Sequence, residues 1–377
     1  MPSADTSGPG AAIPASRAAA GAHDAQGTGS PGAAAATGLE LRGLPRARTI
    51  RYARLELSVR ERIVYWLFVA VLHAFSLIPD FILLRLGALG GFIGFYLDGR
   101  HVRIGMKNLA VAFPNRSVAE RRRILRESYI NLGRSGAEYI RLGGFFRARL
   151  ARRVRYENLE YWNQIADRYP GKGLLVMSAH FGNFELIAAA HSMHGYQISL
   201  VHHMQSFLPG EAMVTFVRER AGVELIRKHS AARAVLRALK AGDVIAIPFD
   251  QNAKRSEAVF VPFFGELAAT TSGLARLAMI SGAPVVPAFI VRDPNHRTHR
   301  IEIMEQVPVQ RTGDTDADVL ENTRRFVGAV EDVVRRYPEQ FLWTHRRFRT
   351  RPRGAPPIYD WNTHATRRSD RPAASPG

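Results

Sequence analysis

The stretch LLVMSAHFGNFELIAAA, residues 174–190, changes from a strand pattern to a helical pattern within a few positions. Residues 174–177 form a short, wholly apolar run, which is typical of a strand buried on both faces. From Asn183 onward the apolar residues suit a helix, with Gly182 and Asn183 as its turn and cap. A strand that leads into a helix in this way is typical of α/β proteins, whose sites lie at the carboxyl ends of the strands.

This turn carries a histidine and a glutamate five positions apart, His180 and Glu185. An imidazole titrates near neutral pH, and a carboxylate can fix its tautomer and stabilise its charged form. The pair therefore predicts a general base for a hydroxyl nucleophile, oriented by Glu185. The alternative interpretation is a loop histidine beside a solvated glutamate, because the same spacing also occurs by chance.

Strand and helix patterns alternate along the rest of the chain. Strands are predicted at 198–202, 223–226, 244–249, 284–291 and 299–304, and helices at 212–221, 230–240, 271–281 and 316–337. The alternation predicts an α/β fold with a largely parallel central sheet flanked by helices. His180, Arg227 and Asp250 each follow a predicted strand, so we expect them to share a site. Taken singly, Arg227 could be a solvated strand-end cation and Asp250 a turn cap.

The composition points to an anionic partner. The 377 residues include 52 Lys and Arg against 33 Asp and Glu, a formal net charge of +19. Such a surplus favours nucleic acid, anionic lipid headgroups or an acidic carrier protein. The chain has no cysteine, which excludes disulfides, thiolate metal sites and a cysteine nucleophile. Its histidines form no recognised metal-binding pattern, so we predict no metal and no tightly bound cofactor.

The N-terminal region divides into a tail and an apolar block. Residues 1–50 are rich in Ala, Gly, Ser and Pro, which predicts an unfolded tail without a secretory leader. The apolar run IVYWLFVAVLHAFSLI at 63–78 is followed by a second run after Pro79, interrupted by Arg85. The first run falls short of the roughly 20 residues that span a bilayer, and Pro79 would end or kink it. A short membrane anchor, a hairpin lying on the membrane and buried core helices remain open, with membrane association preferred.

The segment after residue 100 has an amphipathic helical pattern. Ser117 and Glu120 form the spacing of a capping box, which predicts a helix start. The arginines of this helix are expected on a solvated or membrane-facing surface. Glu138, near a run of small residues, could line a pocket, but a solvated glutamate is the default expectation.

Several segments of the sequence resemble those of a known family. SAHFGNFE resembles the H-x4-D/E motif of the glycerolipid and lysophospholipid acyltransferase superfamily. Further segments resemble the bacterial lipid A biosynthesis (lauroyl/myristoyl) acyltransferases, in the expected order: NLAVAFP at 108–114, DQ at 250–251, VPFFGELAATTSGLARLA at 261–278, GAPVVPAF at 282–289 and PEQFLWTHRRFRTRP at 338–352. The resemblance spans roughly residues 55–353.

The resemblance implies acyl transfer from a thioester donor, usually acyl carrier protein, to a hydroxyl of a phosphorylated glycolipid, the lipid A precursor. It implies that His180 removes the hydroxyl proton and that Glu185 orients the histidine. Arg227 matches the position of a basic residue that binds acceptor phosphate. Asp250 lies where glycerolipid members carry the glutamate of an FPEG motif, but this chain has Phe-Asp-Gln-Asn at 249–252, so the role of Asp250 is less defined. Gln251 and Asn183 are also expected to bind substrate.

The implied organisation is a tail at 1–50, membrane-associating helices at 51–99, an acyltransferase domain at 100–353 and a disordered basic tail at 354–377. The expected partners are acyl carrier protein, an anionic glycolipid or phospholipid acceptor and the membrane, and not nucleic acid. The expected location is the cytoplasmic face of a bacterial inner membrane. The basic residues Arg346, Arg347, Arg349, Arg351 and Arg353 are expected to face one of these partners.

The sequence is also compatible with two alternative functions. The same chemistry could act on a lysophospholipid or a phosphatidylinositol mannoside. A non-enzymatic, basic membrane- or nucleic-acid-binding protein would also explain the charge. That second alternative gives no reason for the apolar block or for the pairing of His180 with Glu185.

Overall fold

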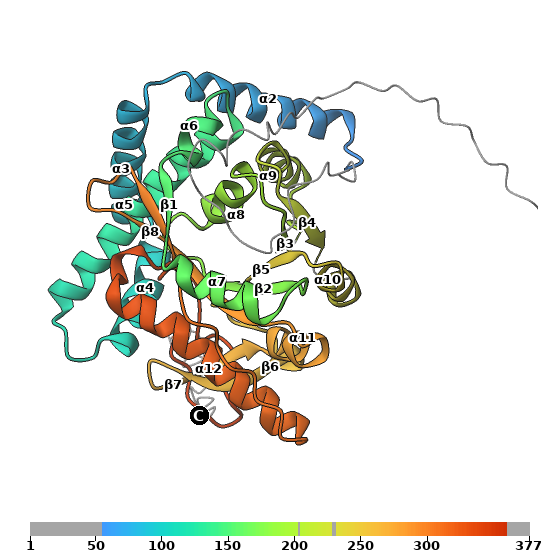
Figure 1. Cartoon of the computed structure of the whole chain (residues 1–377). Helices are drawn as coiled ribbons and strands as arrows, with labels where there is room; N and C mark the ends of the chain where they lie inside the picture. Colours follow the sequence, from blue (N-terminus) through green and yellow to red (C-terminus); the bar gives the residue numbers. More distant parts are fainter. Residues whose placement is uncertain (1–54, 203, 228–230, 360–377) are drawn as a thin grey trace, which may run out of the picture.

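The computed structural model describes residues 55–202, 204–227 and 231–359. Within them, a seven-stranded sheet forms the centre of the molecule (Figure 1). Its spatial order is β1 (Val154–Glu157), β9 (His299–Ile303), β8 (Val285–Arg292), β2 (Leu174–Ser178), β5 (Val244–Pro248), β3 (Ile198–His202) and β4 (Glu224–Arg227). The expected tail at 1–50 and residues 360–377 of the tail expected at 354–377 lie outside the described residues. Residues 354–359 were wrongly assigned to that disordered tail, because Ile358 and Tyr359 pack against the larger apolar cluster and the Tyr359 hydroxyl donates to Asn108 Oδ1 at 2.6 Å.

Most neighbouring strands of this sheet run parallel. The pairs β1–β9, β8–β2, β2–β5, β5–β3 and β3–β4 are parallel, and only β8 and β9 are antiparallel. The prediction of a largely parallel α/β sheet is therefore confirmed. A separate antiparallel hairpin, β6 (Ala258–Phe263) with β7 (Glu266–Thr271), was not predicted. The helix predicted from residue 271 begins only at Gly273, because Thr271 still pairs with Ala258 in the hairpin.

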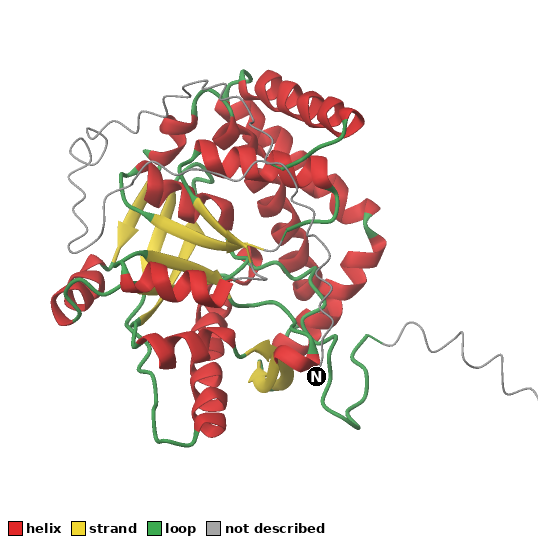
Figure 2. Ribbon diagram, turned by 90° about the vertical axis from the view of Figure 1, so that its right-hand side faces the viewer, coloured by secondary structure: helices red, strands yellow, loops and turns green. Residues whose placement is uncertain are grey.

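Helices cover both faces of the sheet, as Figure 2 shows. Alternate residues of β2 project to opposite faces, so Leu175 and Met177 join one apolar cluster while Leu174 and Val176 join another. The first face is covered by α10 (Ala231–Lys240), α11 (Gly273–Ser281) and α12 (Thr315–Arg336). The second face is covered by α7 (Leu159–Arg168), α8 (Phe184–Met193) and α9 (Leu208–Arg220).

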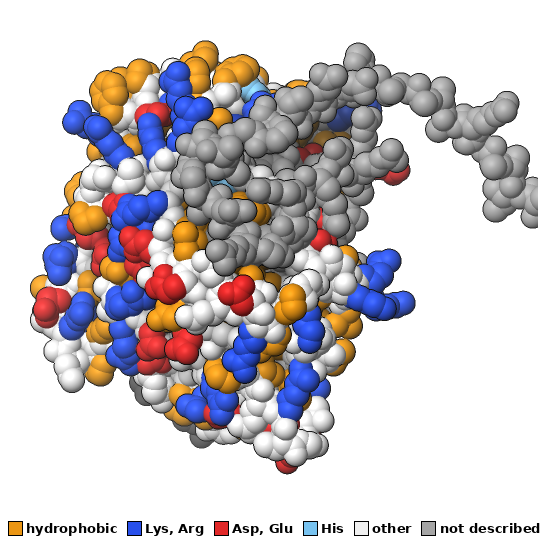
Figure 3. All heavy atoms as spheres, viewed as in Figure 1, with side chains coloured by type: hydrophobic (Ala, Val, Ile, Leu, Met, Phe, Trp, Pro, Cys, Tyr) orange, Lys and Arg blue, Asp and Glu red, His pale blue; other side chains and the backbone are white. Residues whose placement is uncertain are grey.

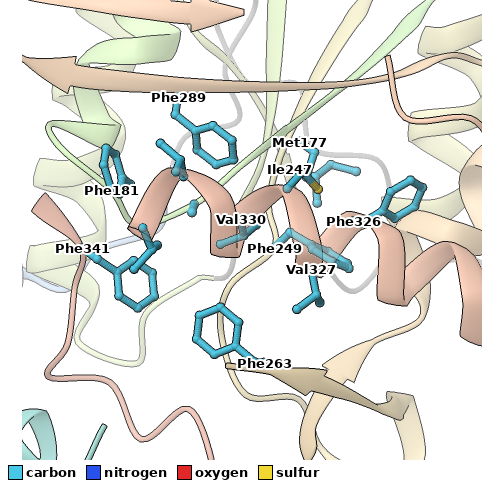
Figure 4. Packing of buried hydrophobic residues seen from close by; sticks show 14 of the residues in the cluster. Met177, Phe181, Ile247, Phe249, Phe263, Phe289, Phe326, Val327, Val330 and Phe341 are labelled. Atoms are coloured by element: carbon cyan, nitrogen blue, oxygen red, sulfur yellow. The ribbon is translucent and has the colours of Figure 1, made fainter. Parts of the chain in front are cut away.

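The larger cluster is rich in aromatic rings. Phe326, Val327 and Val330 of α12 pack toward Phe249 and Phe289 from the sheet (Figure 4). All five side chains are almost fully buried. Burial of one such side chain contributes about 1.5–3 kcal/mol, so this packing fixes the strand ends that carry the site.

In the described part of the chain, five helices precede β1, and two of the longer ones begin at capping boxes. Ser58 and Glu61 form a capping box at the start of α2, and Ser117 and Glu120 form the predicted one at α5. α2 ends before Pro79, as expected. The bounds are α2 Val59–Ser76, α3 Asp80–Leu97, α4 Gly99–Ala112 and α5 Val118–Gly143. A short helix, α6 (Arg147–Ala151), leads into β1.

The helix α3 packs closely along α5 through glycines on both helices. A Cβ atom added at Gly133 would overlap the carbonyl oxygen of Gly87, and one at Gly91 would overlap that of Tyr129. The two backbones can therefore approach only because these positions lack side chains.

The substitution Gly133→Ala is expected to lower the free energy of unfolding by about 1–3 kcal/mol, because the new methyl group must push α3 away from α5. Gly136→Ala on the same helix meets nothing within 4 Å and is the matched control. We expect the control to be neutral or slightly stabilising in chemical denaturation. Equal stability of the two variants would contradict the close packing.

The outer surface of α2 and α3 is apolar. Among the described helices, only α3 is long and apolar enough to cross a membrane by length and composition, and just 11% of that stretch is buried. Figure 3 shows apolar side chains gathered with cations at the top of the molecule, over these helices. The exposed apolar residues include Ile63, Trp66, Leu67, Phe75, Leu77, Phe81, Ile82, Leu86, Leu89, Ile93, Tyr96 and Leu97.

Candidate active site

The centre of the candidate site is a hydrogen bond between His180 and Asp250. His180 follows β2 and Asp250 follows β5, and these parallel strands are neighbours in the sheet. The distance from His180 Nδ1 to Asp250 Oδ1 is 2.9 Å, and the His180 backbone N–H donates to the same oxygen at 3.1 Å. The Asp250 side chain is 2% exposed and that of His180 is 20% exposed. A buried carboxylate thus holds a partly accessible imidazole in one orientation.

The expected contact between Glu185 and His180 is not formed, because both carboxylate oxygens of Glu185 are bonded to Arg218. Arg218 Nε donates to Glu185 Oε2 at 3.0 Å, and its NH2 group donates to Oε1 at 2.7 Å. Glu185 lies in the first turn of α8 and Arg218 in α9, so the pair joins two helices on one face of the sheet. The carboxylate that orients His180 comes from the neighbouring strand and not from its own loop.

Arg218 also connects to a second histidine. Its NH1 group donates to His202 Nδ1 at 2.8 Å, and His202 Nε2 donates to Glu211 Oε1 at 2.6 Å. These four groups form a continuous polar chain from α8 across the end of β3 to α9. The side chains of His202 and Glu211 are 9% and 4% exposed, so the chain is mostly shielded from water. It had no signal in the sequence, because its members are scattered over the 34 residues from Glu185 to Arg218 without a motif.

The charges around His180 stabilise its protonated form. Burial alone would lower the pKa of the imidazole, but Asp250, through its charge and hydrogen bond, raises it. Glu185 adds to the increase and Arg218 opposes it. The net result is a pKa for His180 above the ordinary value of a histidine. Burial opposes ionisation of Asp250, but the interactions with His180 outweigh it and lower the pKa of the carboxyl.

The other ring nitrogen of His180 faces Gln251. The amide Nε2 of Gln251 lies 3.2 Å from His180 Nε2 and can donate to it. With Nδ1–H donating to Asp250, His180 Nε2 carries a lone pair, as a base requires. Gln251 is exposed, and a hydroxyl group could take its place.

The C-terminal segment after α12 fixes the backbone around His180. Leu342 N donates to His180 O at 3.1 Å, and Gly182 N donates to Gln340 O at 2.8 Å. Gly182 has a positive φ of 56°, and a Cβ there would overlap the carbonyl oxygen of Ile290, so the turn requires glycine. His345 accepts from the backbone N–H of Asn252 at 3.0 Å, just beyond Asp250. This segment therefore holds both loops of the site.

Two arginines of this segment do not face outward as expected. Arg347 is 3% exposed and donates to Ala269 O and to Thr270 Oγ1. Arg351 forms an ion pair with Glu266, and its side chain is 11% exposed. Both bind the β6–β7 hairpin, so their role is to dock the C-terminal segment and not to meet a partner.

Asn183 and Glu138 lie inside the protein, contrary to expectation. Asn183 is at the N-cap position of α8, but its side chain is 2% exposed and donates to Glu138 Oε2 at 2.7 Å. Glu138 is 3% exposed and accepts two bonds of 2.7 Å from Arg292. His299 Nε2 lies 2.9 Å from the same carboxylate. Asn183 thus anchors the turn after His180 from within, and its side chain is not open to substrate.

Arg227 ends β4 and is paired with His202 of β3 in the parallel register. It therefore lies at the same edge of the sheet as His180 and Asp250, as predicted. Its side chain is outside what the structure describes. In the described part of the chain, no group of three or more His, Asp or Glu side chains is arranged to hold a metal ion.

Comparison with known proteins identifies the family of the chain. The model of the family described as bacterial lipid A biosynthesis acyltransferase matches residues 53–350. The chain is 28% identical to the lipid A biosynthesis lauroyltransferase of Escherichia coli (strain K12), over 78% of this chain and 94% of that protein. It is 28% identical, with the same coverage, to the lipid A biosynthesis palmitoleoyltransferase of that organism, and 27% identical to its myristoyltransferase, over 77% and 88%. Because the family match covers most of the chain, this protein belongs to the bacterial lipid A biosynthesis acyltransferases and is an acyltransferase enzyme of lipid A biosynthesis.

Proposed function

We propose that His180 is the general base for transfer of a fatty acyl chain from an acyl carrier protein thioester to a hydroxyl of a lipid A precursor. The observation that carries the proposal is the hydrogen bond of 2.9 Å from His180 Nδ1 to the buried Asp250. It presents the lone pair of Nε2 on a partly exposed ring at the carboxyl edge of the sheet. Such an arrangement activates a hydroxyl without an enzyme nucleophile.

The proposed reaction is a direct transfer. As the acceptor oxygen attacks the thioester carbonyl, its proton passes to His180 Nε2, and a new ester C–O bond forms. The C–S bond then breaks, and the imidazolium returns its proton to the departing carrier thiolate. The absence of cysteine from the chain agrees with a route that has no acyl-thioester on the enzyme.

Asp250 takes the orienting role that the sequence assigned to Glu185. It fixes the tautomer through Nδ1 and stabilises the imidazolium that forms during the reaction. Glu185 acts through its charge, which also raises the pKa of His180, while Arg218 holds that carboxylate in place. Gln251 is proposed to give way to the acceptor hydroxyl, and Arg227 to bind acceptor phosphate from the end of β4.

We also propose that the domain at 100–353 works at the cytoplasmic face of the inner membrane. The exposed apolar surface of α2 and α3 would rest on the bilayer. α3 packs on α5, whose first two turns carry the three consecutive arginines Arg121, Arg122 and Arg123. That packing favours helices that lie on the membrane over helices that cross it. The net charge of +19 suits an acidic carrier protein and anionic lipids.

Asp250→Asn is expected to lower kcat by about 10–100-fold, because a hydrogen bond to a charged group contributes about 1.5–3 kcal/mol. It should also move the acid limb of the pH–rate profile to lower pH. The sign follows from the charges: Asp250 raises the pKa of His180, so its loss lowers the pH at which the base becomes protonated.

The profile is measured for both proteins with saturating acceptor, and the control is Asp98→Asn, which makes the same change at a carboxylate that contacts His101 at the start of α4. An acid limb that stays at the same pH in Asp250→Asn would show that Asp250 does not act on the catalytic base.

The substrate assignment is tested with membrane fractions or purified enzyme. Acyl carrier protein thioesters of several chain lengths are offered with a lipid A precursor and, separately, with lysophospholipid acceptors. We expect acylation of the lipid A precursor. Acylation of lysophospholipid alone, or transfer from coenzyme A but not from carrier protein, would overturn the assignment.

A further inference from the structure

A cavity of about 260 Å³ lies apart from the His180 loop, where α3, α5 and the β8–β9 connection meet. Three arginines and a histidine line it, from three different elements: Arg85 of α3, Arg134 of α5, and His296 and Arg297 of the connection. No acidic side chain lines it, and its remaining wall is Phe81, Leu84, Ala88 and Asn295. The cavity therefore combines positive charge with an apolar side.

Two aspartates beside the cavity, Asp80 and Asp293, are bonded elsewhere. Asp80, one turn before Arg85 on α3, is held by Arg141 and Arg153. Asp293, which precedes the connection, is bound by Arg155 and Arg300. Of the described residues, none forms an ion pair with Arg85 or Arg297, and Arg134 makes only a 3.4 Å bond to Asn131. Among the described residues, the cations of the cavity thus have no ion-paired carboxylate, and Glu127, whose charge reaches Arg134 and His296, is paired with Arg126 at 3.6 Å.

The electrostatics of His296 and Arg134 agree with this. Burial, together with the positive charges of Arg134 and Arg292, lowers the pKa of His296 against the weaker opposing charge of Glu127. Burial and Arg292 likewise lower the pKa of Arg134, against the weaker opposing charges of Glu127 and Glu138. An anion in the cavity would relieve this repulsion.

The apolar side of the cavity continues into the exposed surface of α3. Ile82, Leu86 and Leu89 lie on that surface, and Phe81 belongs both to it and to the cavity wall. Arg85 is the only basic residue of α3, and it lines the cavity. A ligand with an anionic head and hydrocarbon chains would satisfy both parts of the site.

We propose that this cavity binds the phosphate headgroup of an anionic membrane lipid whose acyl chains lie along α3. The three arginines suit phosphate oxygens, and the apolar wall suits the start of the lipid chains. The inference rests on the proposed membrane association of α2 and α3, but not on the chemistry of His180. It adds a lipid-selective site to the acyltransferase.

The test is co-sedimentation of the full chain with vesicles of neutral phosphatidylcholine, alone or mixed with anionic phosphatidylglycerol. Arg85→Gln/Arg297→Gln is expected to weaken binding to the anionic vesicles by about 30-fold, which corresponds to about 1 kcal/mol for each cation. Binding to neutral vesicles should be unchanged. The matched control is Arg233→Gln/Arg237→Gln on α10, which removes the same charge on the opposite side of the view in Figure 1. An equal loss in the control would overturn the site in favour of general surface charge.

Two further arms separate the cavity from its alternatives. Ala88→Phe fills the cavity but keeps every charge, and it should abolish the preference for anionic over neutral vesicles. A preference for anionic vesicles that survives this change contradicts the proposal.

Inorganic phosphate, at the concentration of the lipid phosphate, should not displace the protein from anionic vesicles. Displacement would assign the cavity to free phosphate. If the wild-type protein did not bind neutral vesicles, membrane association itself would be contradicted. A variant that loses only acyl transfer bears on the role of His180 and not on the cavity.

Discussion

Replacing His180 by alanine is expected to lower the rate of acyl transfer by about 10²–10⁴-fold, the usual contribution of a positioned general base. The backbone bonds that hold the turn, from Leu342 N to His180 O and from Gly182 N to Gln340 O, do not depend on the ring, so the fold should survive. The loss should appear in kcat more than in KM, because the base acts in the transition state. Transfer is measured as radiolabelled acyl chain moved from carrier protein to lipid A precursor.

The matched control for this variant is His101→Ala. His101 Nδ1 also contacts a carboxylate, that of Asp98 at 2.8 Å, but this pair lies at the start of α4 and is about half exposed. We expect its rate to equal that of wild type. If His180→Ala were as active as His101→Ala and wild type, proton transfer to His180 would have no part in the reaction.

Replacing Glu138 by glutamine is expected to lower the free energy of unfolding by about 3–5 kcal/mol, the cost of leaving a buried charge without its partner. Arg292 is 4% exposed and donates two hydrogen bonds to Glu138, and His299 is fully buried beside it. The amide keeps the size of the carboxylate, so the change tests charge and not packing. The measurement is urea denaturation followed by circular dichroism.

The pH dependence of this effect has a definite direction. Burial opposes ionisation of Glu138, but His299 and Arg292 outweigh it and lower the pKa to about 2. A carboxyl whose pKa falls on folding contributes its stability above the pKa of the unfolded chain, near 4.3. That contribution is lost as the pH falls from there toward about 2. The stability difference between wild type and Glu138→Gln should therefore shrink in acid.

The matched control is Glu321→Gln. Glu321 pairs with Arg324 and Arg325 on the surface of α12, where such pairs contribute about 0–1 kcal/mol. A cost for Glu138→Gln no larger than that of the control would contradict the buried network.

The central strands were predictable because their signal is local. β2 and β5 are short apolar runs, and each lies within a residue or two of its predicted span. The β6–β7 hairpin was not predicted, and its last residue, Thr271, was assigned to the following helix. The prediction that His180 and Asp250 lie at the carboxyl edge of the sheet was correct, because each follows one of two parallel strands.

The pairing within the site was not predictable from spacing. Which carboxylate reaches His180 depends on the order of the strands, and β5 lies beside β2 although 70 residues separate Asp250 from His180. Glu185 is nearer in sequence but is held by Arg218, whose position in α9 has no motif. Glu138 was assigned to solvent because a single glutamate in an arginine-rich helix gives no sign of a buried partner from β8.

The most direct test of the account is the pH dependence of kcat/KM for wild type and for His180→Ala, measured side by side with acyl carrier protein thioester and lipid A precursor. For wild type we predict an acid limb governed by one ionisation, at a pH above the ordinary pKa of histidine, because Asp250 and Glu185 raise the pKa of His180. In His180→Ala the residual rate should lack that ionisation. The same acid limb in both proteins would contradict the claim that His180 is the base.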